Sequence, residues 1–361
     1  MKIEDRLSTT DDQNIQSVTP LISPEEVINQ LPLKQNIADK IKMFRAITHD
    51  IIYKNDDRIL TIVWPCSIHN KKEALEYAKK LKALEKKYPN LFIVMRTYFE
   101  KPRTTIWWKW LVNDPWLDWS FDIETWLKQA RELLLEISEI WLPVSTEFLD
   151  TASPQYIWDL ITWWAIGART TESQIHRELT SWISATVWFK NWTEWNIQIA
   201  IDAIEAAAHD HHFIWATKSW QIALIHSKWN ENTHLILRWG KNWANYDEEN
   251  VKKVSNTLKE KWIKTWIMID ASHANSKKDH KIQPNVIENI ANQIKEWNKE
   301  IIWVMIESNI KEWSQSFTPI KDDPNNIEYG ISITDKCISI DTTDKVLKLL
   351  NDAAAKRKNK Q

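Results

Sequence analysis

The stretch ILTIVWPCSIHNKKEALEYAKKLKALEKKYPNLFIVMR, residues 59–96, decides the fold class. It begins with a β-branched run at 59–63 and ends with a second apolar run at 91–96, and both have the length of a buried strand. Between them, residues 71–88 carry apolar side chains at spacings of three and four, which predicts an amphipathic helix. A strand, a helix and a second strand in this order are typical of a parallel α/β sheet.

The same alternation continues toward the C-terminus. Further strands are expected at 143–148, 165–169, 186–190, 235–238, 266–270 and 301–306, and helices at 35–53, 121–138, 154–163, 194–209, 247–261, 286–296 and 342–356. Eight buried strands interleaved with helices predict an α/β fold, a (β/α)8 TIM barrel, with an open doubly wound sheet as the alternative. Residues 213–228 predict an extra β-hairpin between the fifth helix and the sixth strand.

We expect the chain to consist of two parts. Residues 1–55 form an N-terminal arm and helix with regulatory or oligomer contacts, and Pro20, Pro24 and Pro32 favour an irregular course over 18–34. Residues 56–361 form the catalytic barrel.

Composition excludes several classes of protein. The net charge of -2 argues against a general nucleic-acid binder. No secretory signal and no membrane-spanning apolar run is visible, so we expect a cytoplasmic protein without membrane contacts. Two cysteines in 361 residues are no disulfide framework.

Glycine and tryptophan usage is abnormal. The chain has 3 Gly and 25 Trp, and the two types together, 28 of 361 residues, come close to the share of about 7% that Gly alone usually has. Trp141, Trp182, Trp262 and Trp297 follow helical stretches, where a left-handed residue is favoured. Our hypothesis is that most of these Trp are Gly, encoded by UGA codons that some bacterial lineages read as Gly. The alternative is a protein that is truly rich in Trp.

The predicted strands end in chemically active residues. In a parallel barrel all carboxyl ends of the strands meet at one mouth, where active sites are built. One charged residue there is only the first solvated residue after a buried run. Eight successive strands that each end in a reactive or charged residue favour a functional site. In chain order these residues are Cys66, Arg96, Glu147, Arg169, Lys190, Arg238, His273 and Glu307.

Two sets of side chains can be distinguished. A basic set suits small substrates with several negative charges, and a ring of surface salt bridges is its alternative. This basic set is Arg96, Lys101, Arg103, Arg169, Lys190 and Arg238. A thiolate, an imidazole and two carboxylates suit one divalent metal ion, with Mn, Fe, Co or Zn favoured over Mg or Ca. This metal set is Cys66, His273, Glu307 and Asp335; a structural cysteine and unrelated acids are the alternative, and Cys337 is expected to be structural.

Several motifs carry a resemblance to a known family. Residues 64–69 (WPCSIH), 95–105 (MRTYFEKPRTT), 163–174 (WWAIGARTTESQ) and 187–193 (VWFKNWT) resemble motifs of the type I 3-deoxy-D-arabino-heptulosonate-7-phosphate (DAHP) synthase family, as do 237–241, 269–275 and 332–335. The departures are nearly all Trp for Gly, at Trp64, Trp107, Trp110, Trp164, Trp188, Trp192 and Trp239. In the same motifs Trp108 and Trp163 stand where the family itself has Trp.

The resemblance implies a reaction and a role for each matching residue. The chain would be a transferase that condenses phosphoenolpyruvate with erythrose 4-phosphate, the first step of the shikimate pathway. The metal set would ligate the ion. Arg96, Lys101, Arg169, Lys190 and Arg238 would bind phosphoenolpyruvate, with Glu147 acting through water and together with Lys101 in catalysis, and Arg103 and Thr104 would bind the sugar phosphate.

The resemblance also implies feedback inhibition by an aromatic amino acid and a homodimer or homotetramer. The effector pocket would lie near Pro154, Ser184 and Trp215, and Tyr is the expected effector if Trp215 is Gly. Two competing functions remain open at this point. One is a 3-deoxy-octulosonate 8-phosphate synthase, and the other is an inactive barrel that binds aromatic amino acids.

Overall fold

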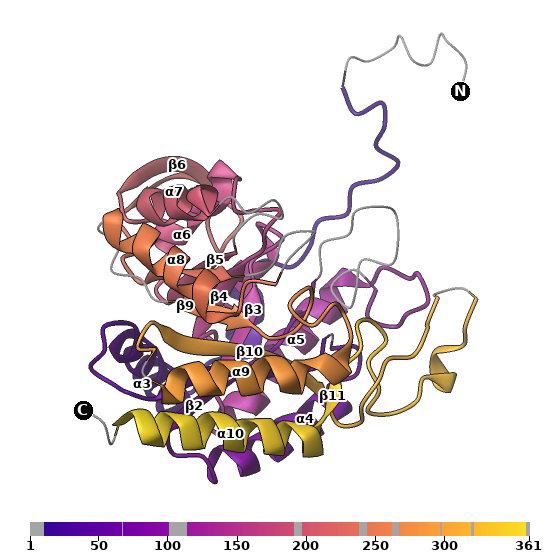
Figure 1. The fold of residues 1–361 in the computed structure, drawn as a ribbon. Coiled ribbons are helices and arrows are strands. Elements are labelled where there is room, and N and C mark those ends of the chain that lie inside the picture. The colour runs from indigo at the N-terminus through magenta and orange to yellow at the C-terminus, as the bar shows by residue number, and fades with distance from the viewer. Residues whose placement is uncertain are drawn as a thin grey trace.

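The computed structural model describes residues 11–66, 68–100, 114–190, 197–237, 244–261, 267–296, 298–318 and 321–358. Eight parallel strands pair in the order β1-β2-β3-β4-β5-β8-β9-β10, and a further pairing of β1 with β10 closes the sheet. Helices surround this closed sheet (Figure 1). The predicted α/β TIM barrel is therefore confirmed, and the open doubly wound sheet is excluded.

All the strands but the fourth agree closely with the expected ranges. Their bounds are β1 Ile59–Trp64, β2 Leu91–Arg96, β3 Val144–Glu147, β4 Trp163–Ile166, β5 Thr186–Lys190, β8 Thr233–Leu237, β9 Ile267–Asp270 and β10 Ile301–Asn309. The short β11, Ile338–Ser339, pairs with the end of β10. The helices are α2 Pro24–Gln30, α3 Gln35–Ile52, α4 Lys71–Glu85, α5 Ile123–Glu139, α6 Gln174–Trp182, α7 Gln198–Ala207, α8 Glu248–Glu260, α9 Gln283–Lys295 and α10 Ile340–Lys358, with short 3-10 helices η1 Ser153–Tyr156, η2 His280–Ile282 and η3 Pro324–Asn326.

The expected helix over 154–163 is wrong. Only η1 forms. Hydrogen bonds between residues three apart, the spacing of a 3-10 helix, continue it, such as the bond from Leu160 N to Ile157 O at 3.0 Å. Thr162 N then donates to Val144 O at 2.9 Å, which places the chain beside β3 at the start of β4.

The fourth strand lies earlier than expected. The range 165–169 was predicted, but β4 ends at Ile166 because the carbonyl of Gly167 accepts turn bonds from Thr170 N and Thr171 N.

The N-terminal arm also departs from the irregular course that was expected. Ser23 and Glu26 form a capping box that begins α2.

The helix α3 closes the amino end of the barrel. Phe44, Ile51 and Ile52 of α3 belong to one buried cluster with inward-facing strand residues such as Leu60 and Ile62. The segment before α2 extends away from the barrel (Figure 1). No helix among the described residues is long and apolar enough to cross a membrane.

The predicted extra hairpin is present between α7 and β8. Its strands β6, His211–Ala216, and β7, Ile222–Ser227, pair antiparallel as a separate two-stranded sheet. The hairpin packs next to η1, where Gln155 Nε2 donates to Ala216 O at 2.8 Å.

Candidate active site at the carboxyl end of the barrel

Three neighbouring strands position the central residues. Cys66 follows β1, Arg96 ends β2 and Glu307 lies in β10. Because β1 pairs with both β2 and β10, and Trp64 is in register with Glu307, these side chains emerge side by side at the carboxyl end of the barrel.

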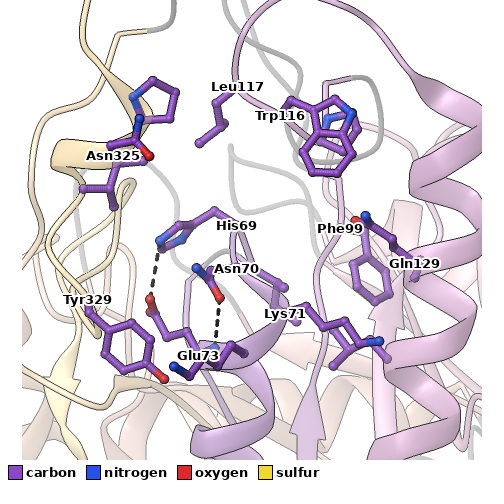
Figure 2. A pocket seen from close by; sticks show the side chains of 17 residues that line it. His69, Asn70, Lys71, Glu73, Phe99, Trp116, Leu117, Gln129, Asn325 and Tyr329 are labelled. Atoms are coloured by element: carbon purple, nitrogen blue, oxygen red, sulfur yellow. Dashed lines mark hydrogen bonds and ion pairs between the residues drawn. The ribbon is translucent and has the colours of Figure 1, made fainter.

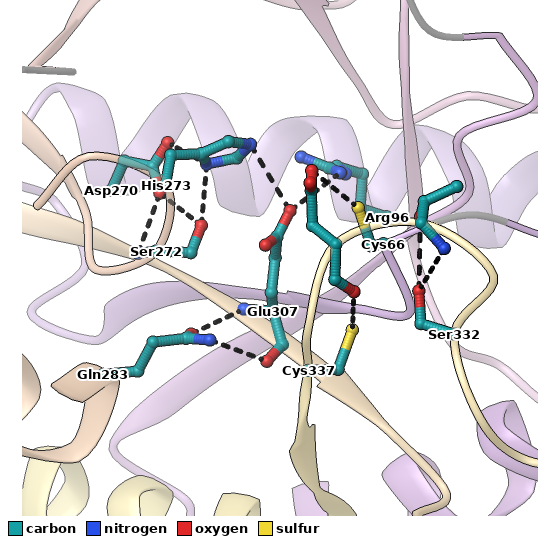
Figure 3. A network of polar contacts seen from close by, with 11 residues as sticks. Cys66, Arg96, Asp270, Ser272, His273, Gln283, Glu307, Ser332 and Cys337 are labelled. Atoms are coloured by element: carbon teal, nitrogen blue, oxygen red, sulfur yellow. Dashed lines mark hydrogen bonds and ion pairs between the residues drawn. The ribbon is translucent and has the colours of Figure 1, made fainter. Parts of the chain in front are cut away.

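The four residues of the expected metal set come together. Cys66 Sγ donates to Asp335 Oδ2 at 3.4 Å, and ligand atoms of Cys66, Glu307 and Asp335 all lie within 4.8 Å of one another. His273 joins this group because its Nε2 lies 3.4 Å from Glu307 Oε1 (Figure 3). Cys66 and Glu307 are buried. Donors spread from residue 66 to residue 335 thus share one small volume.

His273 is held by two residues that the sequence reasoning missed. Its Nδ1 lies 2.9 Å from Asp270 Oδ2 and 2.8 Å from Ser272 Oγ (Figure 3). Burial alone would raise the pKa of Asp270, but the charge of His273 and hydrogen bonds from His273 and Ser272 hold that pKa well below its usual range. The available signal was an acid at the end of a strand, three residues before the histidine.

Glu307 is fixed through its backbone. Gln283 Nε2 donates to Glu307 O at 3.2 Å, and Glu307 N donates to Gln283 Oε1 at 3.0 Å. Glu307 Oε1 is buried and has no hydrogen-bond donor among the described residues. A buried carboxylate oxygen without a donor, beside a thiol and an imidazole, fits a divalent metal ion. Nothing in the sequence around Gln283 indicated its role.

Arg96 is buried beside the metal set. Its Nη2 lies 3.9 Å from Glu307 Oε1, and its guanidinium carbon lies 3.4 Å from the ring centroids of both Trp64 and Tyr98. Arg96 Nε and Nη1 are buried without hydrogen-bond partners in the described part of the chain. A buried guanidinium with unused donors suits an anionic substrate group.

The other expected site residues divide into two groups. Lys190 is buried at the end of β5, Glu147 is half-buried at the end of β3, and Arg169 is exposed after β4. A Cβ at Gly167 would lie 2.3 Å from Oε1 of Glu147, so a side chain there would displace this carboxylate. Lys101, Arg103, Thr104 and Arg238 lie outside the described residues.

Cys337 has the expected structural position. It is buried, and its Sγ donates to the carbonyl of Asp335 at 3.6 Å. Burial raises the pKa of this thiol, and the nearby Cys66 and Glu307 raise it further.

A separate cavity lies beside this site. It is lined in part by His69 and Asn70, which follow Cys66, and by Trp116, Asn325 and Tyr329 (Figure 2). His69 lies 3.5 Å from Glu73, and burial lowers the pKa of His69 to about 4 while it raises that of Glu73. Burial thus favours the uncharged form of both groups.

The expected effector residues lie around the hairpin, in different surroundings. Pro154 is buried in η1 and Trp215 lies half-buried in β6. Ser184 is exposed and lines another cavity together with His226 of β7. The cavity that holds Ser184 includes neither Pro154 nor Trp215.

The fold and its polar mouth define a (β/α)8-barrel enzyme. The sequence matches the model of the DAHP synthetase I family over residues 31–348. The Tyr-sensitive phospho-2-dehydro-3-deoxyheptonate aldolase of Salmonella typhimurium is 45% identical over 329 residues, which is 91% of each chain. The Phe-sensitive enzyme of Escherichia coli is 44% identical over 96% of this chain and 98% of its own.

A solved structure of a similar protein has the same fold. The phospho-2-dehydro-3-deoxyheptonate aldolase of Francisella tularensis superposes with a TM-score of 0.91 at 45% identity, covering 95% of this chain and 99% of that one. The chain belongs to the DAHP synthetase I family. The predicted family and its synthase function are confirmed.

Proposed function

We propose that this chain condenses phosphoenolpyruvate with D-erythrose 4-phosphate and water at the carboxyl end of its barrel, releasing DAHP and phosphate. One observation carries the proposal: Cys66, Glu307 and Asp335 present ligand atoms within 4.8 Å of one another, beside the buried guanidinium of Arg96. A metal site next to a fixed cation suits substrates that bring an aldehyde, a carboxylate and phosphates to one place.

Cys66, His273, Glu307 and Asp335 would hold one divalent ion. The mixture of soft and hard donors favours Mn, Fe, Co or Zn. Such an ion supplies Lewis-acid polarisation of the aldehyde oxygen. Asp270 and Ser272 hold Nδ1 of His273 and thereby leave its Nε2 directed toward Glu307.

The basic side chains orient both substrates. Arg96, Arg169 and Lys190, with Lys101 and Arg238, would bind the carboxylate and phosphate of phosphoenolpyruvate. Arg103 and Thr104 would bind the phosphate of erythrose 4-phosphate. Charge pairing of this kind holds the C3 carbon of phosphoenolpyruvate in reach of the aldehyde carbon. The new C–C bond forms there, water adds at C2, and phosphate leaves by C–O cleavage. Glu147 with Lys101 would position that water and accept its proton.

Regulation and assembly belong to the same proposal. Tyr would inhibit the enzyme at the hairpin, near Pro154, Ser184 and Trp215, provided that Trp215 is Gly and leaves room for the hydroxyl group. The chain would form a cytoplasmic homodimer or homotetramer. Assays with Phe, Tyr and Trp, and a molar mass in solution, test these two points.

Phosphate release tests the reaction itself. The purified protein should release phosphate from phosphoenolpyruvate only when erythrose 4-phosphate is added, and a chelator should stop the release until a divalent metal is restored. Arabinose 5-phosphate serves as the control aldose. Equal or faster turnover with it would favour the octulosonate synthase, and no turnover with either aldose would favour the inactive binding barrel.

A further inference from the structure

A second group of metal-ligating side chains lies on the extra hairpin. In the β6–β7 ladder, His212 stands directly opposite His226, and their rings stack with centroids 3.9 Å apart and planes 17° apart. Asp210, just before β6, places Oδ2 3.6 Å from His226 Nε2. One ligand atom from each of these three residues lies within 4.8 Å of the other two. The group shares no residue with the barrel mouth.

The pattern along β6 selects one histidine for this group. Side chains alternate between the two faces of a strand, so His211 and His212 point to opposite faces. His211 Nε2 bonds to the carbonyl of Ala206 at 2.7 Å, whereas His212 is exposed beside His226. The ladder therefore holds His212 and His226 opposite each other, with both imidazoles on one face of the hairpin. Asp210, which lies just before β6, adds a carboxylate.

The geometry can close around an ion with side-chain movements alone. A tetrahedral ion with ligand bonds of about 2.0–2.2 Å needs donors roughly 3.3 Å apart. Asp210 Oδ2 and His226 Nε2 stand 3.6 Å apart, and the side chains of His226 and Asp210 are 61% and 60% exposed, so both can rotate. Two imidazoles and one carboxylate favour Zn, Ni or Cu over Mg or Ca.

We propose that Asp210, His212 and His226 form a second metal site, for a divalent transition metal such as Zn(II), that joins the two strands at the open end of the hairpin. The fourth position faces solvent and takes water. Because the metal binds the folded hairpin, it also stabilises the pairing of β6 with β7.

Metal counting tests the site on the full-length enzyme. The protein is dialysed against Zn(II) and the bound zinc per chain is measured for the unchanged protein, His212→Ala and His226→Ala. Each variant should bind one equivalent less. The matched control is His209→Ala, which removes an exposed histidine outside the group and should bind zinc like the unchanged protein. Equal zinc counts in all four proteins would overturn the proposal.

A second measurement separates this site from the barrel mouth. Co(II) bound by Cys66 would give a thiolate-to-metal charge-transfer band, whereas the hairpin donors contain no sulfur. His226→Gln should remove one equivalent of Co(II) and leave any thiolate band unchanged. Loss of the thiolate band on this substitution would mean that the change acts through the barrel, and the hairpin site would be rejected. Unchanged phosphate release by the hairpin variants checks that they are folded.

Discussion

The mouth and the interior of the barrel are built by the same strands, yet they differ in how well their side chains fit. At the mouth, His273, Asp270 and Ser272 hold one another at hydrogen-bond distances. In the interior, the rings of Trp163 and Trp188 have centroids only 3.2 Å apart, closer than the about 4.5–7 Å that aromatic pairs prefer. The mouth is a consistent site, whereas the interior is overfilled.

The two crowded tryptophans are not equivalent. Trp163 Nε1 donates to His234 Nε2 at 3.1 Å, while Trp188 Nε1 is buried without an acceptor in the described part of the chain. Trp163 stands where the DAHP synthase motif has Trp, and Trp188 stands where it has Gly. Trp141, outside the barrel, has a φ of 62°, a backbone conformation that Gly adopts readily. These features agree with the hypothesis that many Trp positions are Gly, which the codons would decide.

The largest expected effect tests the mouth. Cys66→Ala removes the soft ligand and should abolish metal-dependent phosphate release, together with one equivalent of bound metal. Cys337→Ala is the matched control, since it deletes a buried thiol that bonds only to a backbone carbonyl among the contacts described above. Full activity of the Cys66 variant would remove this residue from the metal set.

A matched pair of substitutions tests the interior. Trp163→Gly should lower the free energy of unfolding by about 3–5 kcal/mol, the usual cost of deleting a large buried aromatic side chain. Trp188→Gly should instead raise it by about 1–3 kcal/mol, because it relieves overpacking. Denaturant unfolding measures both. Equal destabilisation by the two changes would identify Trp188 as an ordinary core residue and weaken the Gly hypothesis.

Acid should weaken both regions through buried histidines. Burial lowers the pKa of His234 in the interior to about 3 and that of His69 beside the mouth to about 4. These folded-state pKa values lie below the unfolded value of about 6.5. At a pH between the folded and unfolded pKa values, the unfolded chain therefore binds more protons than the folded protein does. The free energy of unfolding consequently falls as the pH falls from about 6.5 toward 4. Each histidine should contribute about 3 kcal/mol to this loss.

Unfolding measured across this pH range checks the expectation. His234→Asn should make stability less dependent on acid, and His209→Asn, at an exposed histidine outside both sites, is the control that should leave the dependence unchanged. A profile of His234→Asn that coincides with that of the unchanged protein would show that this histidine is not held neutral by burial.

The smallest expected effect concerns the positioning of His273. Asp270→Asn keeps the shape of the side chain but removes its charge, and loss of such a partner typically weakens metal binding about 10–100-fold. Metal affinity and turnover should fall together, and the metal-free protein should also lose stability at neutral pH, because the folded state stabilises the ionised form of Asp270. Asp279→Asn, at a half-buried acid that caps η2 in the same loop, should leave metal affinity and turnover unchanged. Unchanged metal affinity in the Asp270 variant would refute the positioning role.

Strand positions could be predicted where burial dominates. The ranges 91–96 and 186–190 were predicted to the residue, because apolar runs of this length between helical patterns have few alternatives. The helix over 154–163 failed because its apolar spacing competes with bonds to β3 that no local pattern encodes.

The sequence by itself determined the alternation of strands and helices, and hence the parallel α/β class, because burial periodicity is a local property. It also predicted reactive side chains near the carboxyl ends of the strands, and Arg96, Glu147 and Lys190 do end their strands. Only the tertiary structure decided that Cys66 and Asp335, 269 positions apart, approach within 3.4 Å, and that Asp270, Ser272 and Gln283 support the residues around them. Such distances arise from closure of the sheet between β1 and β10, which is a property of the whole chain.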